Sequence, residues 1–254
     1  MRVSFLLGCL ASVVFTTSLP VPAAEIKVLT AGAFKPVVTD VVAVFEKQTS
    51  HKVTVENDTA DALLKRIGGV EAFDLVVLTP GALDELTKSG KIANGSTTRL
   101  ARVAIGVAVK RGAALPDIST VAAFQSTLLA ARAVAYIDPA AAGSSGIYLS
   151  NLFEKMGIAD RIKPKAVLVP GGLVARRLVN DQADIAIHQI SEILAVPGAV
   201  LVGPIPAEIQ NYTVYAGGLS ASTREAKAAA DLLAALRSAS AREIMTAKGL
   251  EILP

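Results

Sequence analysis

The stretch AVAYIDPAAAGSSGIYLS, residues 133–150, decides the fold. Its apolar beginning, 133–137, is typical of a buried strand, and apolar residues recur at helical spacing from Ile147 to Met156. The loop between them delivers small residues and two hydroxyls, Ser144 and Ser145, to the start of that helix. Because a helix start has unpaired N–H groups and the positive end of the helix dipole, this loop predicts an anion site. An ordinary helix cap without a ligand is the alternative interpretation.

The same order of strand, small-residue turn and helix recurs along the chain. Residues 26–90 contain it three times, with turns at 30–35, 57–61 and 78–81. A second unit follows from residue 102 with the same alternation. This pattern is typical of open α/β sheets, whose ligands collect beyond the carboxyl ends of the strands. The sequence therefore predicts two α/β units whose turns gather around a ligand.

The N-terminus and composition predict a secreted protein. Arg2 and the apolar run 3–15, which is too short to span a bilayer, predict a secretory signal cleaved near Ala23-Ala24. The 254-residue chain is 52% hydrophobic, enough for one large core or two smaller ones. After the signal there is no apolar segment of membrane length. We expect the mature protein in a periplasm, without membrane insertion.

Charge and cysteine content exclude several classes of function. Removing Arg2 with the signal leaves 24 basic and 22 acidic residues, which is too balanced for a nucleic-acid-binding face. Cys9 is the only cysteine and lies in the signal, which excludes a disulfide framework, a thiol nucleophile and a zinc–thiolate site. Because only two histidines remain, we expect no metal site and no cofactor.

Several segments, taken in order, resemble those of a known family. Ile26–Phe34 resembles its first strand and small-residue turn, and Leu63–Val77 resembles its second helix and third strand. Asp138–Tyr148 resembles its loop into a ligand-facing helix, and Arg242–Leu250 resembles its C-terminal helix. By the order and spacing of these segments, the chain is similar to the periplasmic solute-binding proteins of ABC importers. The resemblance is to their type II fold, in the branch that includes molybdate-binding proteins.

The resemblance implies two α/β lobes with a central ligand cleft and two chain crossovers. Lobe 1 would comprise residues 25–104 and 215–254, and lobe 2 residues 105–214. In this family the ligand closes the lobes about a hinge, and a membrane permease recognises the closed form. The resemblance therefore implies a monomeric binding protein, not an enzyme, whose partners are a small anion and an ABC transporter permease.

Three positions depart from the molybdate-binding pattern. The first turn has Ala33 where those proteins usually have serine, and His188 stands where they often have tyrosine. The second turn, 57–61, carries the carboxylates of Asp58 and Asp61 in place of serines. A dianion beside them would meet like charge unless they point away. We therefore expect a divergent member whose ligand is a molybdate-like oxyanion or a small organic acid.

The candidate ligand-binding residues come from five turns, and most are small residues that expose backbone N–H groups. Lys35 would add positive charge, and His188 and Gln189 would contact the ligand through their side chains. Thr59 as a simple helix cap and His188 as a half-buried residue at a strand end are the structural alternatives. The candidates are Gly32, Ala33, Phe34, Lys35, Thr59, Ala60, Ser144, Ser145, Gly146, Gly171, Gly172, His188 and Gln189.

A secreted serine hydrolase is a second hypothesis, with Ser144 or Ser145 as nucleophile beside His188 and Asp184. The sequence lacks the Gly-x-Ser-x-Gly elbow of α/β-hydrolases, and its Gly-Ser-Ser-Gly turn does not replace that motif. A cytoplasmic effector-sensing domain of the same fold is a third hypothesis. The signal segment and the lack of a DNA-binding domain argue against it.

Overall fold

The computed structural model describes residues 23–253. The predicted signal segment, 1–24, lies outside the described residues except for Ala23 and Ala24. The strands are β1 (Glu25–Ala31), β2 (Lys52–Asp58), β3 (Leu75–Leu78), β4 (Thr98–Lys110), β5 (Val134–Ile137), β6 (Ala166–Val169), β7 (Ile185–Gln189), β8 (Ala199–Pro204), β9 (Tyr212–Leu219) and β10 (Leu250–Ile252). The α-helices are α1 (Lys35–Thr49), α2 (Ala60–Gly68), α3 (Pro80–Lys88), α4 (Val121–Ala130), α5 (Ser144–Lys155), α6 (Ala159–Ile162), α7 (Arg176–Val179), α8 (Ile190–Leu194), α9 (Ala226–Ala235) and α10 (Ala239–Ala247). Short 3-10 turns are η1 (Gly32–Phe34), η2 (Pro139–Ala141), η3 (Lys163–Lys165) and η4 (Ala207–Ile209).

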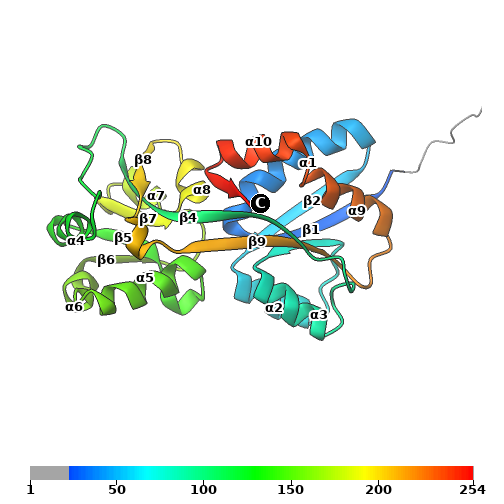
Figure 1. The fold of residues 1–254 in the computed structure, drawn as a ribbon, viewed down its shortest axis with the longest axis horizontal. Helices are drawn as coiled ribbons and strands as arrows, with labels where there is room; N and C mark the ends of the chain where they lie inside the picture. The colour runs from blue at the N-terminus through cyan, green and yellow to red at the C-terminus, as the bar shows by residue number, and fades with distance from the viewer. Residues whose placement is uncertain (1–22, 254) are drawn as a thin grey trace, which may run out of the picture.

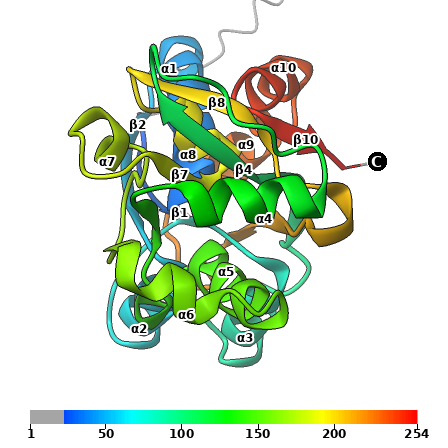
Figure 2. The ribbon, with the colours of Figure 1, turned by 90° about the vertical axis from the view of Figure 1, so that its left-hand side faces the viewer.

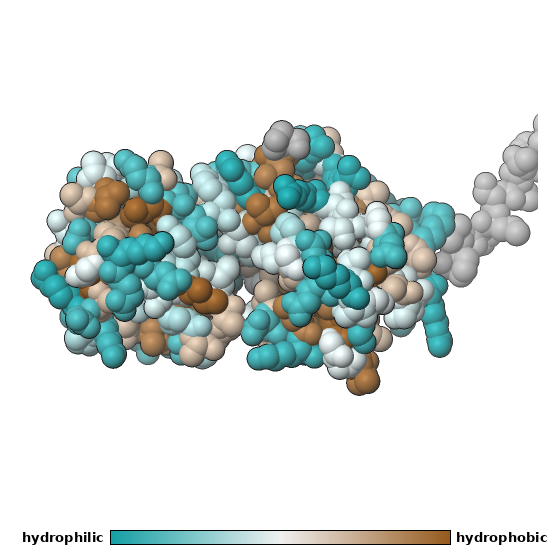
Figure 3. Space-filling model, turned by 60° about the horizontal axis from the view of Figure 1, so that its bottom comes forward, coloured by the Kyte–Doolittle hydropathy of each residue, from teal (hydrophilic) through white to brown (hydrophobic). Residues whose placement is uncertain are grey.

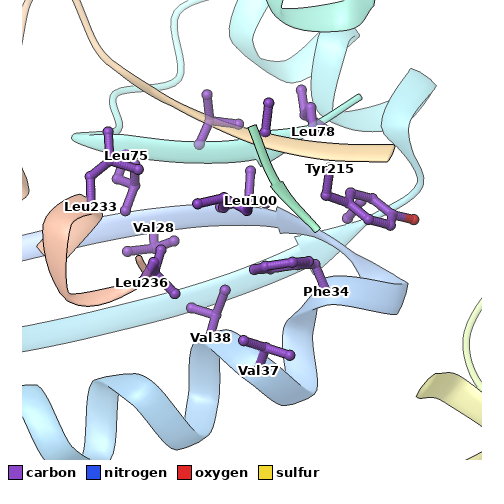
Figure 4. Packing of buried hydrophobic residues seen from close by; sticks show 14 of the residues in the cluster. Val28, Phe34, Val37, Val38, Leu75, Leu78, Leu100, Tyr215, Leu233 and Leu236 are labelled. Atoms are coloured by element: carbon purple, nitrogen blue, oxygen red, sulfur yellow. The ribbon is translucent and has the colours of Figure 1, made fainter. Parts of the chain in front are cut away.

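The first sheet contains the N-terminal strands in the order β2-β1-β3-β9-β4. β1 pairs in parallel with β2 and β3, whereas β9 runs antiparallel to β3 and β4. α1, α9 and α10 lie on one side of this sheet, and α2 and α3 lie on the other (Figure 1). Because both faces are covered, β3 is entirely apolar and buried. The largest core cluster includes Phe34, Val38, Leu75 and Leu233 (Figure 4).

The second sheet has the order β4-β7-β5-β6, with β8 also paired to β4. β5 is parallel to β6 and β7, as expected from the alternation of strands and helices in this part of the sequence. One core cluster here contains Phe124, Tyr136 and Phe153, and a smaller one contains Val174 and Leu178. Figure 2 looks onto this half of the molecule, with α4 crossing in front of the sheet.

β4 and β9 connect the two halves (Figure 1). β4 is 13 residues long. It pairs with β9 from Thr98 to Ala104 and with β7 from Ile105 onward, so one strand belongs to both sheets. The protein therefore has the predicted type II fold with two α/β lobes. The lobe boundaries, 25–104 plus 215–254 and 105–214, stay a prediction.

The helices and strands predicted from clear hydrophobic periodicity agree with the structure better than the short elements do. α5 begins at Ser144, three residues before the predicted start at Ile147, because Gly143 takes the extended cap conformation. The helix expected after the turn that contains Gly171 and Gly172, from the alternation of the second unit, is only the single turn of α7. α6, α8 and β10 were not predicted because each is short, and β8 was not predicted because it is only partly buried and shows no clear alternation. Within the described residues, no helix combines the length and the apolar character needed to cross a membrane.

Candidate ligand-binding site

A cavity of about 260 Å³ lies where turns of the two halves meet. The space-filling view shows a groove between these halves (Figure 3). The residues that line the cavity lie mostly at the carboxyl ends of β1, β2, β3, β5, β6 and β7, as expected for an open α/β sheet. They are Ala31, Gly32, Ala33, Asn57, Asp58, Thr59, Ala60, Thr79, Ile137, Gly143, Ser144, Ser145, Gly171, Gly172, His188, Gln189, Glu192 and Tyr215.

Helix starts surround this cavity. Thr59 caps α2 and Thr79 caps α3, and each hydroxyl accepts a hydrogen bond from an N–H group of the first turn. Gly143 precedes α5, Gln189 precedes α8, and Gly32 opens η1 ahead of α1. Each start contributes the positive end of a helix dipole and N–H groups without helical partners. The cavity can therefore hold an anion, although no lysine or arginine is among the described residues that line it.

Most of the candidate residues come together at this cavity. Those that line it are Gly32, Ala33, Thr59, Ala60, Ser144, Ser145, Gly171, Gly172, His188 and Gln189. They come from turns that are up to 157 residues apart in sequence, between Gly32 and Gln189. The turns are adjacent because parallel strands present their carboxyl ends at one edge of each sheet.

Three candidates lie elsewhere. Phe34 is fully buried in the core, with its ring centroid 5.5 Å from that of Tyr215. Lys35 is exposed at the start of α1 and is not among the residues that line the cavity. Gly146 packs α5 against β5, and a Cβ there would overlap the carbonyl oxygen of Ile137. Phe34 and Gly146 thus support the site from behind.

Several lining residues were missed by the sequence reasoning. Asn57 and Thr79 belong to turns that were recognised, so the turn pattern could have included them. Glu192 lies in the first turn of the unpredicted helix α8, four residues after His188. Tyr215 comes from the middle of β9, and its local sequence gives no sign that it reaches a ligand.

Asp58 lines the cavity, but its carboxylate is engaged by the protein. Oδ1 accepts a hydrogen bond of 2.8 Å from the Thr59 N–H, and Oδ2 lies 3.8 Å from Arg66 Nη1. Arg66 also bonds Glu56 and Glu71, and hydrogen bonds from Arg66 and Lys27 lower the pKa of Glu71 to about 2. Asp58 thus has a hydrogen-bond donor and a positive charge beside it within the protein, which moderates its repulsion of an anion.

Asp61, the other carboxylate of the second turn, is not among the lining residues. It lies 3.6 Å from Lys65 on the exposed side of α2. An anion in the cavity therefore faces one carboxylate of this turn instead of two.

Gln189 ties together three elements beside the cavity. Its Nε2 donates to Ser144 Oγ over 3.0 Å and to Thr213 Oγ1 over 2.9 Å, and these two hydroxyls lie 3.3 Å apart. The Tyr215 hydroxyl reaches Gln189 Oε1 at 3.5 Å. Burial, with a contribution from the charge of Glu192, raises the pKa of Tyr215 well above its usual range. The network fixes Ser144 and leaves Ser145, which is 3% exposed, as the second hydroxyl of the α5 start.

His188 and Glu192 form a buried pair in the wall of the cavity. His188 Nε2 lies 3.1 Å from Glu192 Oε2, and their side chains are 2% and 8% exposed. Burial lowers the pKa of His188 to about 3 and raises that of Glu192 to about 8. At pH 7 both groups are therefore mainly neutral, and the short distance is a hydrogen bond between neutral groups. His188 Nδ1 is buried without a hydrogen-bond partner among the described residues.

Glycine at position 32 allows Glu192 to approach the first turn. A Cβ on Gly32 would lie 2.8 Å from Glu192 Oε1. The neighbouring Ser191 hydroxyl donates to the Ala33 carbonyl oxygen over 2.7 Å. These contacts join α8 to η1, so the buried pair lies where the two lobes touch.

We expect this pair to make stability fall between about pH 6.5 and 8. The folded chain keeps the Glu192 proton between the unfolded pKa of 4.5 and the folded pKa of about 8, so this stabilisation is lost as the pH rises through that range. The lowered pKa of His188 has the opposite effect between about pH 3 and 6.5. The two effects on the free energy of unfolding offset each other from pH 4.5 to 6.5. Between about pH 6.5 and 8 only the effect of Glu192 remains, and the free energy of unfolding falls by about 2 kcal/mol.

Urea unfolding of the wild type and of Glu192→Gln at pH 5 to 9 measures this effect. The stability of the wild type relative to the variant should decrease as the pH rises. A difference that is the same at every pH would show that Glu192 is not protonated in the folded chain.

The serine hydrolase hypothesis does not fit this geometry. Asp184 accepts hydrogen bonds from the Arg132 N–H and the Arg132 guanidinium, while His188 contacts Glu192 instead. Ser144 is bonded to Gln189 and Thr213. The triad of this alternative hypothesis is therefore not assembled, because Asp184 precedes β7 whereas His188 lies at the other end of that strand. Among the described residues, no group of three or more His, Cys, Asp and Glu side chains is arranged to hold a metal ion.

Two α/β lobes with an anion-compatible cavity between them define a binding protein of the periplasmic type. The chain belongs to the bacterial extracellular solute-binding proteins, whose family model matches residues 26–251. It is a divergent member, beside the molybdate-binding proteins in fold.

Three known proteins are similar to the chain. It is 34% identical over 239 residues to an aconitate isomerase of a Pseudomonas species, which covers 92% of this chain and 90% of the isomerase. The periplasmic molybdate-binding protein of Azotobacter vinelandii has a TM-score of 0.75 at 20% identity, covering 91% of this chain and 100% of that one. The sulfate-binding protein SubI of Mycobacterium tuberculosis has a TM-score of 0.71 at 15% identity, covering 91% and 87%. The two structures show a shared fold.

Proposed function

We propose that the chain captures a small organic polycarboxylate between its two lobes, outside the cytoplasm. The observation that carries the proposal is the 34% identity, over nearly the whole chain, to a protein named for aconitate, a tricarboxylate. The oxyanion-binding structures are no more than 20% identical. Of the positions that depart from the molybdate pattern, Ala33, Asp58 and His188 line the cavity, whereas Asp61 does not.

The chemistry of the cavity supports an acid with several carboxylates. Helix starts on both lobes present separate groups of N–H donors, so carboxylates spaced along one molecule can each meet a different helix. The cavity volume of about 260 Å³ approaches the roughly 300–1,000 Å³ of ordinary small-molecule pockets, so a ligand larger than a tetrahedral oxyanion suits it. Ile137 and Tyr215 add apolar surface that suits a carbon skeleton.

Membership of the solute-binding family supports a role in transport. In our proposal the signal segment directs the chain to the periplasm, where it acts as a monomer. A ligand that contacts both lobes would favour their closure, because it binds the closed form more tightly. The closed form would then deliver the ligand to an ABC transporter permease.

We expect the mature chain to bind trans- or cis-aconitate at least about tenfold more tightly than molybdate, tungstate or sulfate. Titration calorimetry measures the affinities, and thermal melting gives an independent test. A ligand present at about a hundredfold its Kd stabilises the folded state by about 2.7 kcal/mol. Tighter binding of an oxyanion than of every di- and tricarboxylate tested would overturn the proposal.

Ser145→Ala tests whether the ligand occupies this cavity. Loss of one hydrogen bond of about 1 to 1.5 kcal/mol should weaken binding about tenfold. Ser240→Ala is the matched control, since Ser240 is exposed on α10 in the C-terminal part of the chain. Equal affinities of the two variants would place the ligand elsewhere.

The same relative favours a second candidate function, isomerisation of the bound acid. Its name describes a reaction, and the cavity of this chain contains a buried pair, His188 and Glu192, with strongly shifted pKa values. Capture of an anion by backbone N–H groups does not need such a pair, whereas proton transfer does. In this case the chain would be an enzyme built on a binding-protein fold.

A further inference from the structure

We propose that His188 moves a proton between two carbons of a bound unsaturated polycarboxylate, and that Glu192 positions its imidazole. This inference rests on the proposed binding of such an acid. It adds the reacting residue and the type of reaction, a 1,3-proton shift.

The first argument is the unpaired nitrogen. Both ring nitrogens of His188 are enclosed, yet Nε2 has a partner at 3.1 Å whereas Nδ1 has none among the described residues. A buried polar atom without a partner costs about 1–3 kcal/mol, so its retention in a ligand cavity calls for a role. With Nε2–H donating to Glu192 Oε2, Nδ1 carries the lone pair and can accept a proton.

The second argument is the position of the pair between the lobes. His188 is the last residue but one of β7 in lobe 2, and Glu192 Oε1 reaches the first turn of lobe 1 at Gly32. A ligand held by helix starts of both lobes would therefore lie against the imidazole. Closure would exclude water from the reacting atoms and strengthen electrostatic interactions with the protein.

The reaction needs no oxidant and no second substrate. Nδ1 takes a proton from a methylene carbon that is next to both a carboxylate and the double bond, and that C–H bond breaks. Its electron pair forms a new double bond to the central carbon, while the old double bond becomes a delocalised carbanion. The imidazolium then returns its proton to the former vinyl carbon, so a C–H bond forms there and the double bond has moved by one position.

The surroundings suit both halves of this step. The intermediate spreads negative charge onto carboxylates, which the N–H groups of the helix starts can stabilise. The imidazolium is held at Nε2 by Glu192. The other titratable side chains that line the cavity have other partners: Asp58 is bonded by the Thr59 N–H and lies near Arg66, and Tyr215 reaches Gln189. His188 is therefore the group free to exchange a proton.

The first test uses the wild-type mature chain with trans-aconitate in D2O. Proton NMR should show deuterium entering the methylene and vinyl positions, together with formation of the cis isomer. Calorimetry on the same sample measures binding. Binding without deuterium exchange would overturn this inference and leave the proposed capture function intact, whereas absence of binding would overturn both.

Variants of His188 and Glu192 then test the role of each residue, beginning with His188. His188→Gln places an amide near the position of Nε2, keeps the contact with Glu192 and removes Nδ1, so we expect kcat to fall by about 100-fold or more. Its Kd should stay within about threefold of the wild type. His51→Gln is the control, since His51 is the other histidine and its Nδ1 accepts from the Ala24 N–H far from the cavity lining.

Glu192 is tested as a positioning residue by two substitutions. Glu192→Gln retains an oxygen that accepts from Nε2 and should lose less than about tenfold in kcat, whereas Glu192→Leu should lose about as much as His188→Gln. Equal losses in both Glu192 variants, with KM unchanged, would show that the carboxyl itself transfers the proton. Deuterium exchange that persists in folded His188→Gln would overturn the assignment of His188.

Discussion

Replacing Phe34 with alanine should lower the free energy of unfolding by about 3–5 kcal/mol, the usual cost of deleting a fully buried aromatic ring. Phe34 has no exposed surface and lies between Tyr215 and the first helix, where Val37 and Val38 complete its surroundings (Figure 4). The cavity left by the ring would also loosen Tyr215, whose ring is tilted by 45° against it. The melting temperature should fall by roughly 10 °C for a chain of this size.

Phe34→Leu separates the two roles considered for this residue. Leucine keeps most of the apolar volume, so the loss of stability should be smaller, and ligand affinity should stay within about threefold of the wild type. If Phe34→Leu instead kept its stability and lost binding tenfold or more, the ring itself would contact the ligand, whereas the sequence had predicted a contact through the backbone N–H group. Leu83→Ala, in the same cluster on α3, is a matched control for core truncation.

The alternation of strands and helices could be predicted because each element is encoded by its own stretch of sequence. Apolar runs such as 75–78 and the helical spacing of Val37, Val38, Val41 and Val42 identify their elements without knowledge of the rest of the chain. Three of the α-helices and strands that were missed, α6, α8 and β10, have five residues or fewer. The fourth, β8, is a partly buried strand without clear alternation. Such segments adopt their structure because β4 or a neighbouring helix supplies the partner.

The sequence predicted the parts of the site that depend on the ends of parallel strands. It did not predict the parts that depend on contacts between segments far apart in the chain. Turns after parallel strands must meet at one edge, so Thr59, Ser144 and Gly171 could be grouped in advance. The contact between His188 and Glu192 requires α8, and the place of Tyr215 requires the pairing of β9 with β3 and β4. Phe34 and Lys35 were included because they flank a glycine turn. The sequence does not show whether such a residue packs its side chain in the core or presents its backbone to the ligand, and only the burial seen in the structure decides this.

Gly146→Ala should destabilise the chain by about 3 kcal/mol and weaken ligand binding at the same time. The added methyl would overlap the carbonyl oxygen of Ile137 and lie 3.0 Å from its Cγ2 atom. The overlapping oxygen is backbone in β5, so it cannot rotate away, and overpacking of this kind costs about 1–3 kcal/mol or more. The relief available is an outward shift of α5, which would carry Ser144 away from Gln189 and Thr213.

Gly68→Ala is the matched control, because it makes the same substitution in a helix where no atom lies within 4 Å of the new Cβ. It should raise stability by about 0.5–1 kcal/mol, since alanine is the better helix former, and leave binding unchanged. Urea unfolding and titration calorimetry of both variants measure the contrast. If Gly146→Ala lost stability but bound the ligand as tightly as the wild type, the start of α5 would not contribute to the site. In that case the helix that the decisive stretch of sequence creates would serve the fold alone, and the anion would be held by the turns of the remaining strands.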